Sequence, residues 1–475
     1  MSDLLSQLNP EQATAAATVN GPVLVLAGAG TGKTRVITFR IAYMLSIGIP
    51  PEQILGMTFT NKAAHEMRER LATLVDPAVA ARVTLGTFHS FCVRVLRRDA
   101  AKLGYLPGFT IADDSDQTGL LKQAVGESGL DSQKGISIAA VQAQIGKWKN
   151  RLLTPKDAKS AAETRFEESC AQIYTHYQEL LELQNSVDFD DMLLLVHRLF
   201  TTRPEVLAKY QERYKYLLID EYQDTNAAQF TIVKLLVGES CNLCVVGDDD
   251  QSIYSWRGAD VSNILNFTDY FPEAKVVKLE QNYRSCKRIL SAANAVIGAN
   301  PNRHDKNLWS KLGEGDKVQI VKTANGEAEA DFIAAMIRQL HDSDKFSYRD
   351  FAILYRSNHL SRELEQALRR SQISYRLVGG QEFYKRREIK DAVSYLKLIV
   401  NPRDDQSLLR ILGTPPRGLA AKAVEQLKIG RMSSHLPMIE QLDTAQFQSS
   451  LSAKASCAAK ELSSVYQKHR AIFQT

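Results

Sequence analysis

A glycine-rich stretch between an apolar run and a helix-like segment carries the residues best suited to chemistry. It reads Ala-Gly-Ala-Gly-Thr-Gly-Lys-Thr over residues 27–34 and follows the apolar residues 23–26. Glycines let the backbone curl until several N–H groups face one anion, and the following helix adds the positive end of its dipole. Lys33 would then reach the β- and γ-phosphates of a nucleotide, and the Thr34 hydroxyl suits Mg²⁺. The stretch therefore predicts a phosphate-binding loop.

The predicted nucleotide contacts of this loop are Ala27, Gly28, Ala29, Gly30, Thr31, Gly32, Lys33, Thr34 and Arg35. The usual pattern starts with Gly, whereas this one starts with Ala27. A glycine-rich turn that binds no nucleotide is the alternative interpretation. The order of strand, turn, Lys-Thr and helix favours the phosphate-binding loop.

Two further apolar runs end in clusters of polar side chains. Residues 217–219 precede the adjacent carboxylates Asp220 and Glu221, and residues 245–247 lead to Gln251. In P-loop enzymes the first acid at such a strand end holds Mg²⁺, directly or through water, and the second can polarise the water that attacks the γ-phosphate. We therefore assign Asp220 to the metal and Glu221 to general-base chemistry, and we expect Gln251 near the γ-phosphate. The alternative is an exposed acidic turn, which the phosphate-binding loop upstream disfavours.

The loop after Gln251 combines two aromatic side chains with a cation. Tyr254, Trp256 and Arg257 stand within a polar stretch. Aromatic rings and a guanidinium can stack on unpaired bases of any sequence, because every base offers a π-face. The loop therefore indicates contact with single-stranded nucleic acid. The alternative is that Trp256 is buried for packing alone.

Alternating strand-like and helix-like runs must position these residues. Apolar runs at 54–58, 83–85, 216–219 and 241–247 alternate with helical patterns such as 62–74 and 88–103. This alternation predicts a mostly parallel sheet covered by helices on both faces. Between about residues 113 and 199 the patterns are helical, which predicts a helical insertion.

A second alternation begins after residue 278. Its expected strands are 318–322, 351–355 and 375–378, with helices at 328–340 and 360–371. From residue 389 the pattern is helical, and no strand follows to complete the second sheet. The sequence therefore predicts the α/β class with two α/β domains and helical insertions.

Composition limits the class of protein. Of the 475 residues, 44% are hydrophobic and 24% charged, which is ordinary for a soluble globular chain. No apolar run is long enough to span a membrane and the N-terminus lacks a secretory signal, so we expect a cytoplasmic protein. The net charge of +5 permits a polyanionic partner without requiring one. We interpret Cys241 and Cys244 as core thiols, with metal or redox use as the alternative.

Eight stretches, taken in order, resemble the motifs of superfamily-1A DNA helicases of the UvrD, Rep and PcrA type, with the Rep group nearest in pattern. They are Gln12 and residues 27–34, 58–64, 87–90, 188–191, 220–226, 246–259 and 279–285. The similarity extends over essentially the whole chain. It implies two RecA-like P-loop motor domains with ATP bound between them.

The resemblance assigns roles to individual residues. Gln12 is similar to the glutamine that reads the adenine edge, and Tyr283 to the aromatic residue that stacks on the adenine ring. Arg284 is similar to the arginine that reaches the γ-phosphate from the second motor domain and stabilises the charge there. The implied single-strand contacts are Phe59, Asn61, His89, Phe189, Tyr254, Trp256, Arg257, Arg356 and Asn358. Core packing is the alternative for His89 and Phe189.

The resemblance also divides the chain. It implies motor domain 1A at residues 1–110 and 201–278, a helical insertion 1B at 111–200, motor domain 2A at 279–383 and a helical subdomain 2B at 384–475, which residues 383–391 open. Family members continue beyond this length. Two of their later motifs, one of which supplies a second arginine to the γ-phosphate, are not found here. We therefore expect 2A and 2B to be incomplete.

The implied activity is ATP-dependent translocation on single-stranded DNA in the 3′-to-5′ direction, with unwinding of duplex DNA in replication or repair. Its catalytic residues would be Lys33, Glu221, Gln251 and Arg284, with ATP and Mg²⁺ as cofactors. Implied partners are single-stranded DNA, junctions of single and double strands, and replication or repair proteins, engaged by a monomer or a DNA-induced dimer without a membrane. Two alternatives stay open: a hydrolysis-impaired fragment or regulator that binds ATP and single-stranded DNA, and the helicase half of a helicase–nuclease.

Overall fold

The structure, a computed structural model, describes residues 2–474 except 131–136, 344–345, 379–385, 418, 420 and 435. It divides into two compact units, and we describe each by itself. Unit 1 comprises Met1–Gly315 with Asp391–Thr475, and unit 2 comprises Asp316–Lys390. The expected boundary between 2A and 2B, at residues 383 and 384, lies outside the described residues.

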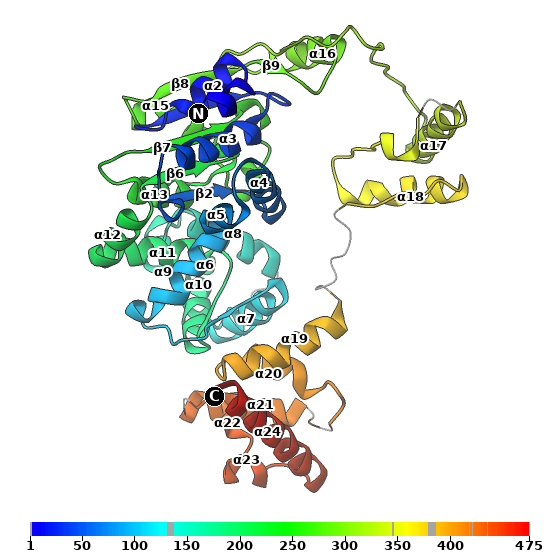
Figure 1. The fold of residues 1–475 in the computed structure, drawn as a ribbon. Helices are drawn as coiled ribbons and strands as arrows, with labels where there is room; N and C mark the ends of the chain where they lie inside the picture. Colours follow the sequence, from blue (N-terminus) through cyan, green and yellow to red (C-terminus); the bar gives the residue numbers. More distant parts are fainter. Residues whose placement is uncertain are drawn as a thin grey trace. The chain divides into compact units, whose positions relative to one another are not determined.

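A six-stranded parallel sheet forms the centre of unit 1 (Figure 1) and confirms the predicted α/β class. Its strand order is β3-β2-β6-β7-β1-β8. The strands are β1 (Val23–Ala27), β2 (Ile54–Thr58), β3 (Thr84–Thr87), β6 (Tyr216–Ile219), β7 (Leu243–Gly247) and β8 (Lys275–Leu279). Every residue of β1, β2 and β7 is buried, as expected for parallel strands that are covered on both faces.

Two layers of helices cover the sheet, and alternate residues of each strand point into them. Leu24 and Leu26 pack into one hydrophobic core, while Val23 and Val25 pack into the other. The first core is completed by α6 (Phe88–Asp99), α11 (Asp191–Thr202), α12 (Pro204–Arg213) and α13 (Ala227–Val237). The second is completed by α2 (Pro10–Ala17), α3 (Lys33–Ser46), α4 (Asn61–Leu74) and α5 (Pro77–Arg82). A short helix, α1 (Ser2–Ser6), precedes α2.

The register of the strands brings the predicted motifs to one edge of the sheet. Leu26 pairs with Gly247, Ala27 with Leu279, and Thr58 with Thr87. The segments that follow these residues therefore leave the sheet side by side. Ligands of open parallel sheets bind outside the carboxyl ends of the strands, so this edge is where a site is expected.

The helical insertion is present, but it rests on a short strand pair that the sequence did not predict. Strands β4 (Thr110–Ile111) and β5 (Ser186–Val187) run parallel and join the two ends of the insertion. Between them lie α7 (Asp114–Glu127), α8 (Ile138–Asn150), α9 (Pro155–Ala161) and α10 (Arg165–Leu183). Two residues per strand are too few to give an alternating pattern, which explains the omission.

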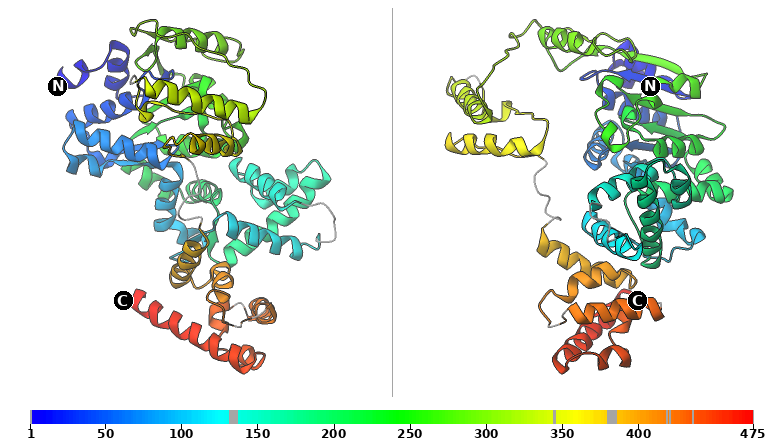
Figure 2. Two further views of the ribbon diagram at one scale, coloured as in Figure 1. Left: turned by 90° about the vertical axis from the view of Figure 1, so that its right-hand side faces the viewer. Right: turned by 180° about the vertical axis from the view of Figure 1, so that it is seen from behind.

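The C-terminal part of unit 1 is helical, as predicted, and it packs against the base of the insertion (Figure 2). Asn401 donates hydrogen bonds to Thr110 Oγ1 (3.1 Å) and to the carbonyls of Gln184 (2.9 Å) and Asn185 (3.0 Å). The helices are α19 (Arg387–Val400), whose first residues up to Lys390 belong to unit 2, α20 (Asp405–Leu412), α21 (Ala421–Ser434), α22 (Met438–Gln441), α23 (Ala445–Ser449) and α24 (Ala453–Gln474).

Unit 1 continues past β8 into a small substructure. It contains α16 (Lys287–Ile297) and the parallel pair β9 (Gln281–Asn282) and β10 (Trp309–Ser310). The short helices α14 (Ser262–Leu265) and α15 (Phe267–Tyr270) connect β7 with β8. The sequence starts the second motor domain at residue 279, whereas the contacts group residues up to Gly315 with the first sheet.

Unit 2 contains two packed helices, α17 (Gly326–Asp342) and α18 (Ser361–Arg370). The strands expected at 318–322, 351–355 and 375–378 are not formed, so this part of the prediction is wrong for the described structure. Ile320, Leu354 and Val378, one in each segment, are 97%, 92% and 79% exposed. The runs have strand-like residues but no ladder partner, and a strand is stable only when its backbone groups are paired.

Other expectations from composition concern the membrane and the cysteines. Among the described residues, no helix combines the length and the apolar character that crossing a bilayer requires. Cys244 is buried within β7, in agreement with its interpretation as a core thiol, whereas Cys241 is partly exposed. Both thiols are free.

Candidate nucleotide and nucleic-acid site

The predicted phosphate-binding loop joins β1 to α3 with a backbone that requires glycine. Gly30 and Gly32 have φ angles of +69° and +89°, in the left-handed region. A Cβ on Gly30 would lie 2.6 Å from the Asn282 amide nitrogen, and one on Gly32 would lie 2.8 Å from that of Gln12. Ala27, where the usual pattern has Gly, is the last residue of β1 and is fully buried. Its methyl group is part of the hydrophobic core.

Lys33 contacts residues of the two other polar motifs, those that follow β6 and β7, at the same edge of the sheet. Its Nζ atom lies 2.8 Å from Glu221 Oε2 and donates to Gln251 Oε1 at 3.4 Å. Glu221 has a φ of +50°, which is uncommon for a residue with a side chain and costs backbone energy. Gln223 donates to the same Glu221 oxygen at 2.9 Å. Three of the four predicted catalytic residues are therefore in direct contact.

Asp220 is almost fully buried beside this cluster. Burial and the negative charge of Glu221 raise the pKa of Asp220 to about 7, while Lys33 acts in the opposite direction. A cation placed beside this carboxylate would relieve both effects. Asp220 and the Thr34 hydroxyl, in the first turn of α3, are oxygen donors of the kind Mg²⁺ prefers.

The donor set fits a metal that is shared with a nucleotide. Within the described residues, no group of three or more His, Cys, Asp or Glu side chains could hold a metal ion by itself. Mg²⁺ commonly takes one or two protein ligands and fills its other positions with phosphate oxygens and water. Asp220 and Thr34 therefore suit a Mg²⁺ ion that arrives with phosphates.

The two residues predicted to hold adenine are Gln12, in the first turn of α2, and Tyr283, which follows β9, and both contact Asn9. The Gln12 amide donates to the Thr31 carbonyl at 2.8 Å and its oxygen accepts from the Asn9 backbone at 3.2 Å. Asn9 also donates to the Tyr283 hydroxyl at 3.0 Å. Tyr283 is 50% exposed, so part of its side chain is accessible to a base. The sequence analysis missed Asn9, although Asn-Pro is a recognisable helix start.

The segment after β9 is bound directly to the phosphate-binding loop. Asn282 Nδ2 donates to the Ala29 carbonyl at 2.6 Å, and the Tyr283 backbone N–H donates to the Gly30 carbonyl at 3.0 Å. Arg284 follows immediately with an exposed side chain. Arg35, on the other side, donates to the Gln7 carbonyl at 2.9 Å.

The first group of predicted single-strand contacts forms an exposed aromatic cluster. The rings of Phe59 and Tyr254 stack with centroids 5.1 Å apart, and Trp256 lies 6.3 Å from Tyr254. The Arg257 guanidinium stands 4.6 Å from the centre of the Trp256 ring. Trp256 is 64% exposed, so the alternative of a buried packing residue is wrong. Asn61 begins α4 and is also exposed.

The second group pairs the partly buried ring of His89 with an exposed ring. His89 and Phe189 stack with centroids 3.7 Å apart, and Phe189 is 52% exposed. The core-packing alternative is therefore wrong for Phe189. His89 Nε2 is buried without a hydrogen-bond partner, and burial lowers the pKa of His89 to about 4. A neutral imidazole thus supports the Phe189 ring.

A buried lysine that the sequence analysis missed anchors the Phe189 loop. Lys149 Nζ lies 2.6 Å from Asp188 Oδ2 and 2.7 Å from Asp191 Oδ1, and none of its surface is exposed. Burial lowers the pKa of Lys149, but the two carboxylates outweigh it and raise the pKa well above its usual value. Tyr177 donates to the same Asp188 oxygen at 2.9 Å. The sequence shows Lys149 only as one residue of a helical pattern, and this pattern does not indicate that the lysine is buried against two aspartates.

The last two predicted contacts, Arg356 and Asn358, belong to unit 2. Both side chains are exposed. Asn358 begins a short 3₁₀ turn, Asn358–Leu360, that leads into α18.

Comparison with family models and curated proteins gives consistent matches. Residues 8–272 match the UvrD/REP helicase N-terminal domain, and residues 277–451 match the UvrD-like helicase C-terminal domain. The chain is 46% identical over 426 residues to the ATP-dependent DNA helicase PcrA of Leuconostoc citreum, covering 90% of this chain and 57% of that protein.

It is 45% identical over 448 residues to the ATP-dependent DNA helicase PcrA of Staphylococcus aureus strain Mu50 and to that of Staphylococcus epidermidis, covering 94% of this chain and 61% of each relative. The chain thus spans 57–61% of the length of these relatives. Since the N-terminal family model alone matches more than half of its residues, the chain belongs to the UvrD/REP helicase family.

Proposed function

We propose that this chain provides the ATP-hydrolysing and single-strand-binding part of a DNA helicase that moves along single-stranded DNA in the 3′-to-5′ direction. The observation that carries the proposal is the contact of Lys33 with both Glu221 and Gln251 at the end of the phosphate-binding loop. The names of the PcrA relatives support the same activity. The direction and a role in replication or repair follow the family resemblance.

The proposed hydrolysis uses residues already in contact. Lys33 binds the β- and γ-phosphate oxygens of ATP and, in doing so, exchanges its partner Glu221 for the nucleotide. Glu221 then accepts a proton from the attacking water, while the Gln251 amide orients the γ-phosphate. Asp220 and Thr34 would hold Mg²⁺, which would supply positive charge to neutralise the phosphate oxygens. Arg284 would stabilise the charge that develops on the γ-phosphate.

The proposed adenine site uses Gln12 and Tyr283. Gln12 is fixed by the Thr31 carbonyl and Asn9, so its amide is held in one orientation. The exposed ring of Tyr283 offers a stacking surface for the base. A fixed amide can distinguish the hydrogen-bonding edge of adenine from that of guanine.

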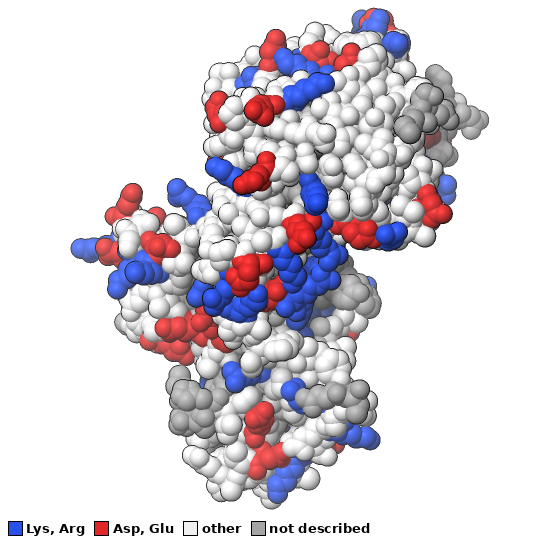
Figure 3. All heavy atoms as spheres, turned by 60° about the vertical axis from the view of Figure 1, so that its left-hand side comes forward, with Lys and Arg blue, Asp and Glu red and all other residues white. Residues whose placement is uncertain are grey.

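The proposed single-strand surface is built from stacking residues and cations. The cluster of Phe59, Tyr254, Trp256 and Arg257 offers two or more rings to unpaired bases, at about 1–3 kcal/mol per base. Lys and Arg side chains gather across the middle of the face drawn in Figure 3, with Asp and Glu among them. The net charge of +5 on the whole chain permits a polyanionic partner.

We also propose the domain division given by the resemblance, with 1A at residues 1–110 and 201–278, 1B at 111–200, 2A at 279–383 and 2B at 384–475. Closure of 2A on nucleotide bound to 1A would alternate the DNA contacts of the two motor domains. Arg356 and Asn358 would be the contacts of 2A.

The test is ATP hydrolysis by the purified chain with and without single-stranded DNA, with Lys33→Ala as the variant. We expect hydrolysis that rises when DNA is added and is abolished in the variant, and unwinding of a duplex with a 3′ tail in preference to one with a 5′ tail. DNA-stimulated hydrolysis that survives Lys33→Ala would contradict the proposal. Salt-sensitive DNA binding without any hydrolysis would instead identify a binding fragment or regulator.

A further inference from the structure

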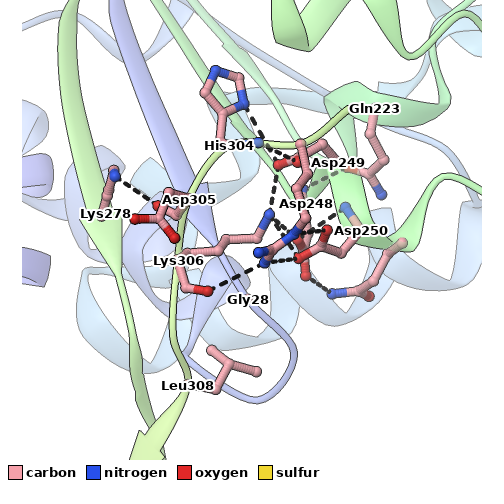
Figure 4. Close-up of polar contacts among 12 residues, drawn as sticks. Gly28, Gln223, Asp248, Asp249, Asp250, Lys278, His304, Asp305, Lys306 and Leu308 are labelled. Atoms are coloured by element: carbon pink, nitrogen blue, oxygen red, sulfur yellow. Dashed lines mark hydrogen bonds and ion pairs between the residues drawn. The ribbon is translucent and has the colours of Figure 1, made fainter. Parts of the chain in front are cut away.

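Residues 303–308, which we call the 303–308 segment, run between β8 and the loop that follows β7 (Figure 4). Leu308 lies beside Gly28, where a Cβ would overlap its side chain. On one side Lys278 donates to the Asp305 carbonyl at 2.6 Å, and on the other His304 donates its backbone N–H to Asp249 at 2.9 Å. The segment is therefore fixed at both sides, directly over the start of the phosphate-binding loop.

Lys306 binds all three aspartates that follow β7. Its Nζ atom lies 3.0 Å from Asp248 Oδ1, 2.6 Å from Asp249 Oδ1 and 2.9 Å from Asp250 Oδ2. The Lys306 side chain is 2% exposed. Burial raises the pKa of Asp249, but hydrogen bonds from His304 and Lys306, together with the Lys306 charge, outweigh it and hold this pKa far below the usual range. A buried ion pair often adds little net stability, because removing the charges from water costs about as much as their attraction gains.

Arg303 belongs to the same segment but has a different set of partners. Its Nε and terminal nitrogen atoms lie 2.9 Å and 2.8 Å from the two oxygens of Asp250. It also donates to the Lys306 carbonyl at 3.2 Å. Arg303 has no contact with Asp248 among these bonds, so it provides an internal comparison for Lys306.

Asp248 connects Lys306 to the candidate catalytic residues. One oxygen, Oδ1, faces Lys306, and the other, Oδ2, accepts from the Gln251 amide at 2.5 Å. The Gln251 amide oxygen in turn faces Lys33 at 3.4 Å. Since the Asp248 carboxylate is rigid, fixing one oxygen fixes the direction of the other. The chain of contacts from Lys306 to Lys33 therefore sets the orientation of the Gln251 amide.

The same segment is attached to the strand that leads to Arg284. Asn307 donates its backbone N–H to Glu280 at 2.7 Å, and β10 pairs with β9 directly after the segment. Lys306 thus lies on the part of the chain that carries the second group of nucleotide contacts, while its partners lie on the first.

We propose that Lys306 is a positioning residue, which through Asp248 holds the Gln251 amide toward Lys33 and so makes orientation of the γ-phosphate depend on the seating of the 303–308 segment. The kinetic part of this inference rests on the proposed function. A group that orients the transferring phosphoryl lowers kcat when it is lost, whereas a group that binds nucleotide in the ground state raises KM. Replacement of Lys306 is therefore expected to lower kcat and to leave KM for ATP nearly unchanged.

The experiment compares Lys306→Gln with the rescue variant Lys306→Arg and the control Arg303→Gln. The first measurement is hydrogen exchange of the amides of residues 248–252 without nucleotide. We expect faster exchange in Lys306→Gln, exchange close to that of the unaltered chain in Lys306→Arg, and a smaller increase in Arg303→Gln, which loses only the bonds to Asp250. The second measurement is DNA-stimulated ATP hydrolysis. We expect Lys306→Gln to lower kcat at least tenfold with KM for ATP changed less than twofold, Lys306→Arg to recover most of the loss, and Arg303→Gln to stay within twofold.

Equal losses in Lys306→Gln and Arg303→Gln, or a loss confined to KM, would overturn the inference, as would unchanged exchange at residues 248–252. If Lys306→Gln fails to fold, the double variant Lys306→Gln/Asp249→Asn removes one cation and one anion and leaves Asp248 without its lysine; the same outcomes apply to it. Should the unaltered chain hydrolyse no ATP, the proposed function fails, and the exchange measurement alone still decides whether Lys306 orders residues 248–252.

Discussion

The Nζ atom of Lys33 lies 2.8 Å from Oε2 of Glu221. The residue predicted to hold phosphate thus neutralises the residue predicted to accept a proton. Glu221 makes this contact from a left-handed backbone conformation, with a φ of +50°. A nucleotide that takes Lys33 would leave the carboxylate as a base beside the γ-phosphate.

Glu221→Gln keeps the size of the side chain and removes its basicity. We expect kcat for ATP hydrolysis to fall by about 10²- to 10⁴-fold, the usual contribution of a positioned base, while nucleotide binding is retained. Hydrolysis kinetics and binding of a fluorescent ATP analogue are the measurements. Glu239→Gln, at an exposed carboxylate beyond α13, is the matched control. Equal activity of the two variants would contradict the assignment of Glu221.

Gln12→Ala removes the amide that is fixed between Thr31 and Asn9. We expect KM for ATP to rise by roughly 2- to 10-fold, the worth of one hydrogen bond, and KM for GTP to rise less. The preference for ATP over GTP is the informative quantity, since loosening of the Thr31 carbonyl would affect both nucleotides alike. An unchanged preference would mean that Gln12 supports the loop without reading the base.

Trp256→Ala removes the most exposed ring of the first aromatic cluster. We expect single-stranded DNA to bind roughly 5- to 150-fold more weakly, from about 1–3 kcal/mol per stacked base. Fluorescence anisotropy of a labelled oligonucleotide at one fixed salt concentration measures this. Phe166→Ala, at a 41% exposed ring on α10, is the control and should bind as the unaltered chain does. Similar losses in both would point to an unspecific effect.

His89 makes stability depend on pH. Its pKa in the folded protein is about 4, below the ordinary value near 6.5, so between these values the unfolded chain binds a proton that the folded one does not. The contribution of His89 to the free energy of unfolding is therefore complete above about pH 6.5 and is lost progressively as the pH is lowered toward 4. We expect a loss of about 2 kcal/mol at pH 5 relative to pH 8. His89→Gln should lack this part of the pH dependence in urea unfolding; the same pH dependence in both proteins would refute it.

Lys149→Met leaves the carboxylates of Asp188 and Asp191 buried without a cation. We expect a loss of about 3–5 kcal/mol in the free energy of unfolding, together with weaker single-strand binding through the Phe189 loop. Lys147→Met, at an exposed position on the same helix, should change stability little. The measurement is urea unfolding of the two variants. Coincident unfolding curves would exclude a structural role for Lys149.

The grouping of the candidate nucleotide-site residues was predictable because they follow apolar strands. The bounds of β2 and β6 agree with the predicted runs, and parallel strands bring the segments after them to one edge. The residue types then indicated phosphate and metal chemistry without any knowledge of distances. The exposure of the aromatic loop was predictable for a different reason, because Trp256 stands in a polar stretch of the sequence.

The supporting contacts were not predictable. Lys149 sits in an amphipathic helix where lysine normally faces water, and its burial depends on two aspartates 39 and 42 residues away. Lys306 likewise lies in a loop, and only the tertiary structure brings it to the aspartates after β7. The prediction of strands in unit 2 was wrong because a run of strand-like residues shows only a preference for extended backbone. A strand also needs a neighbouring strand with which to form hydrogen bonds.

The position of β1 in the sheet has a consequence for synthesis of the chain. Its neighbours are β7 and β8, with Leu24 paired to Val245 and Val276, so both partners are made more than two hundred residues later. At translation rates of 5–20 residues per second, β1 waits roughly 10 to 50 seconds on the ribosome. During that time its run of Val and Leu is exposed. The nascent polypeptide is thus expected to engage cellular chaperones until β8 emerges from the exit tunnel.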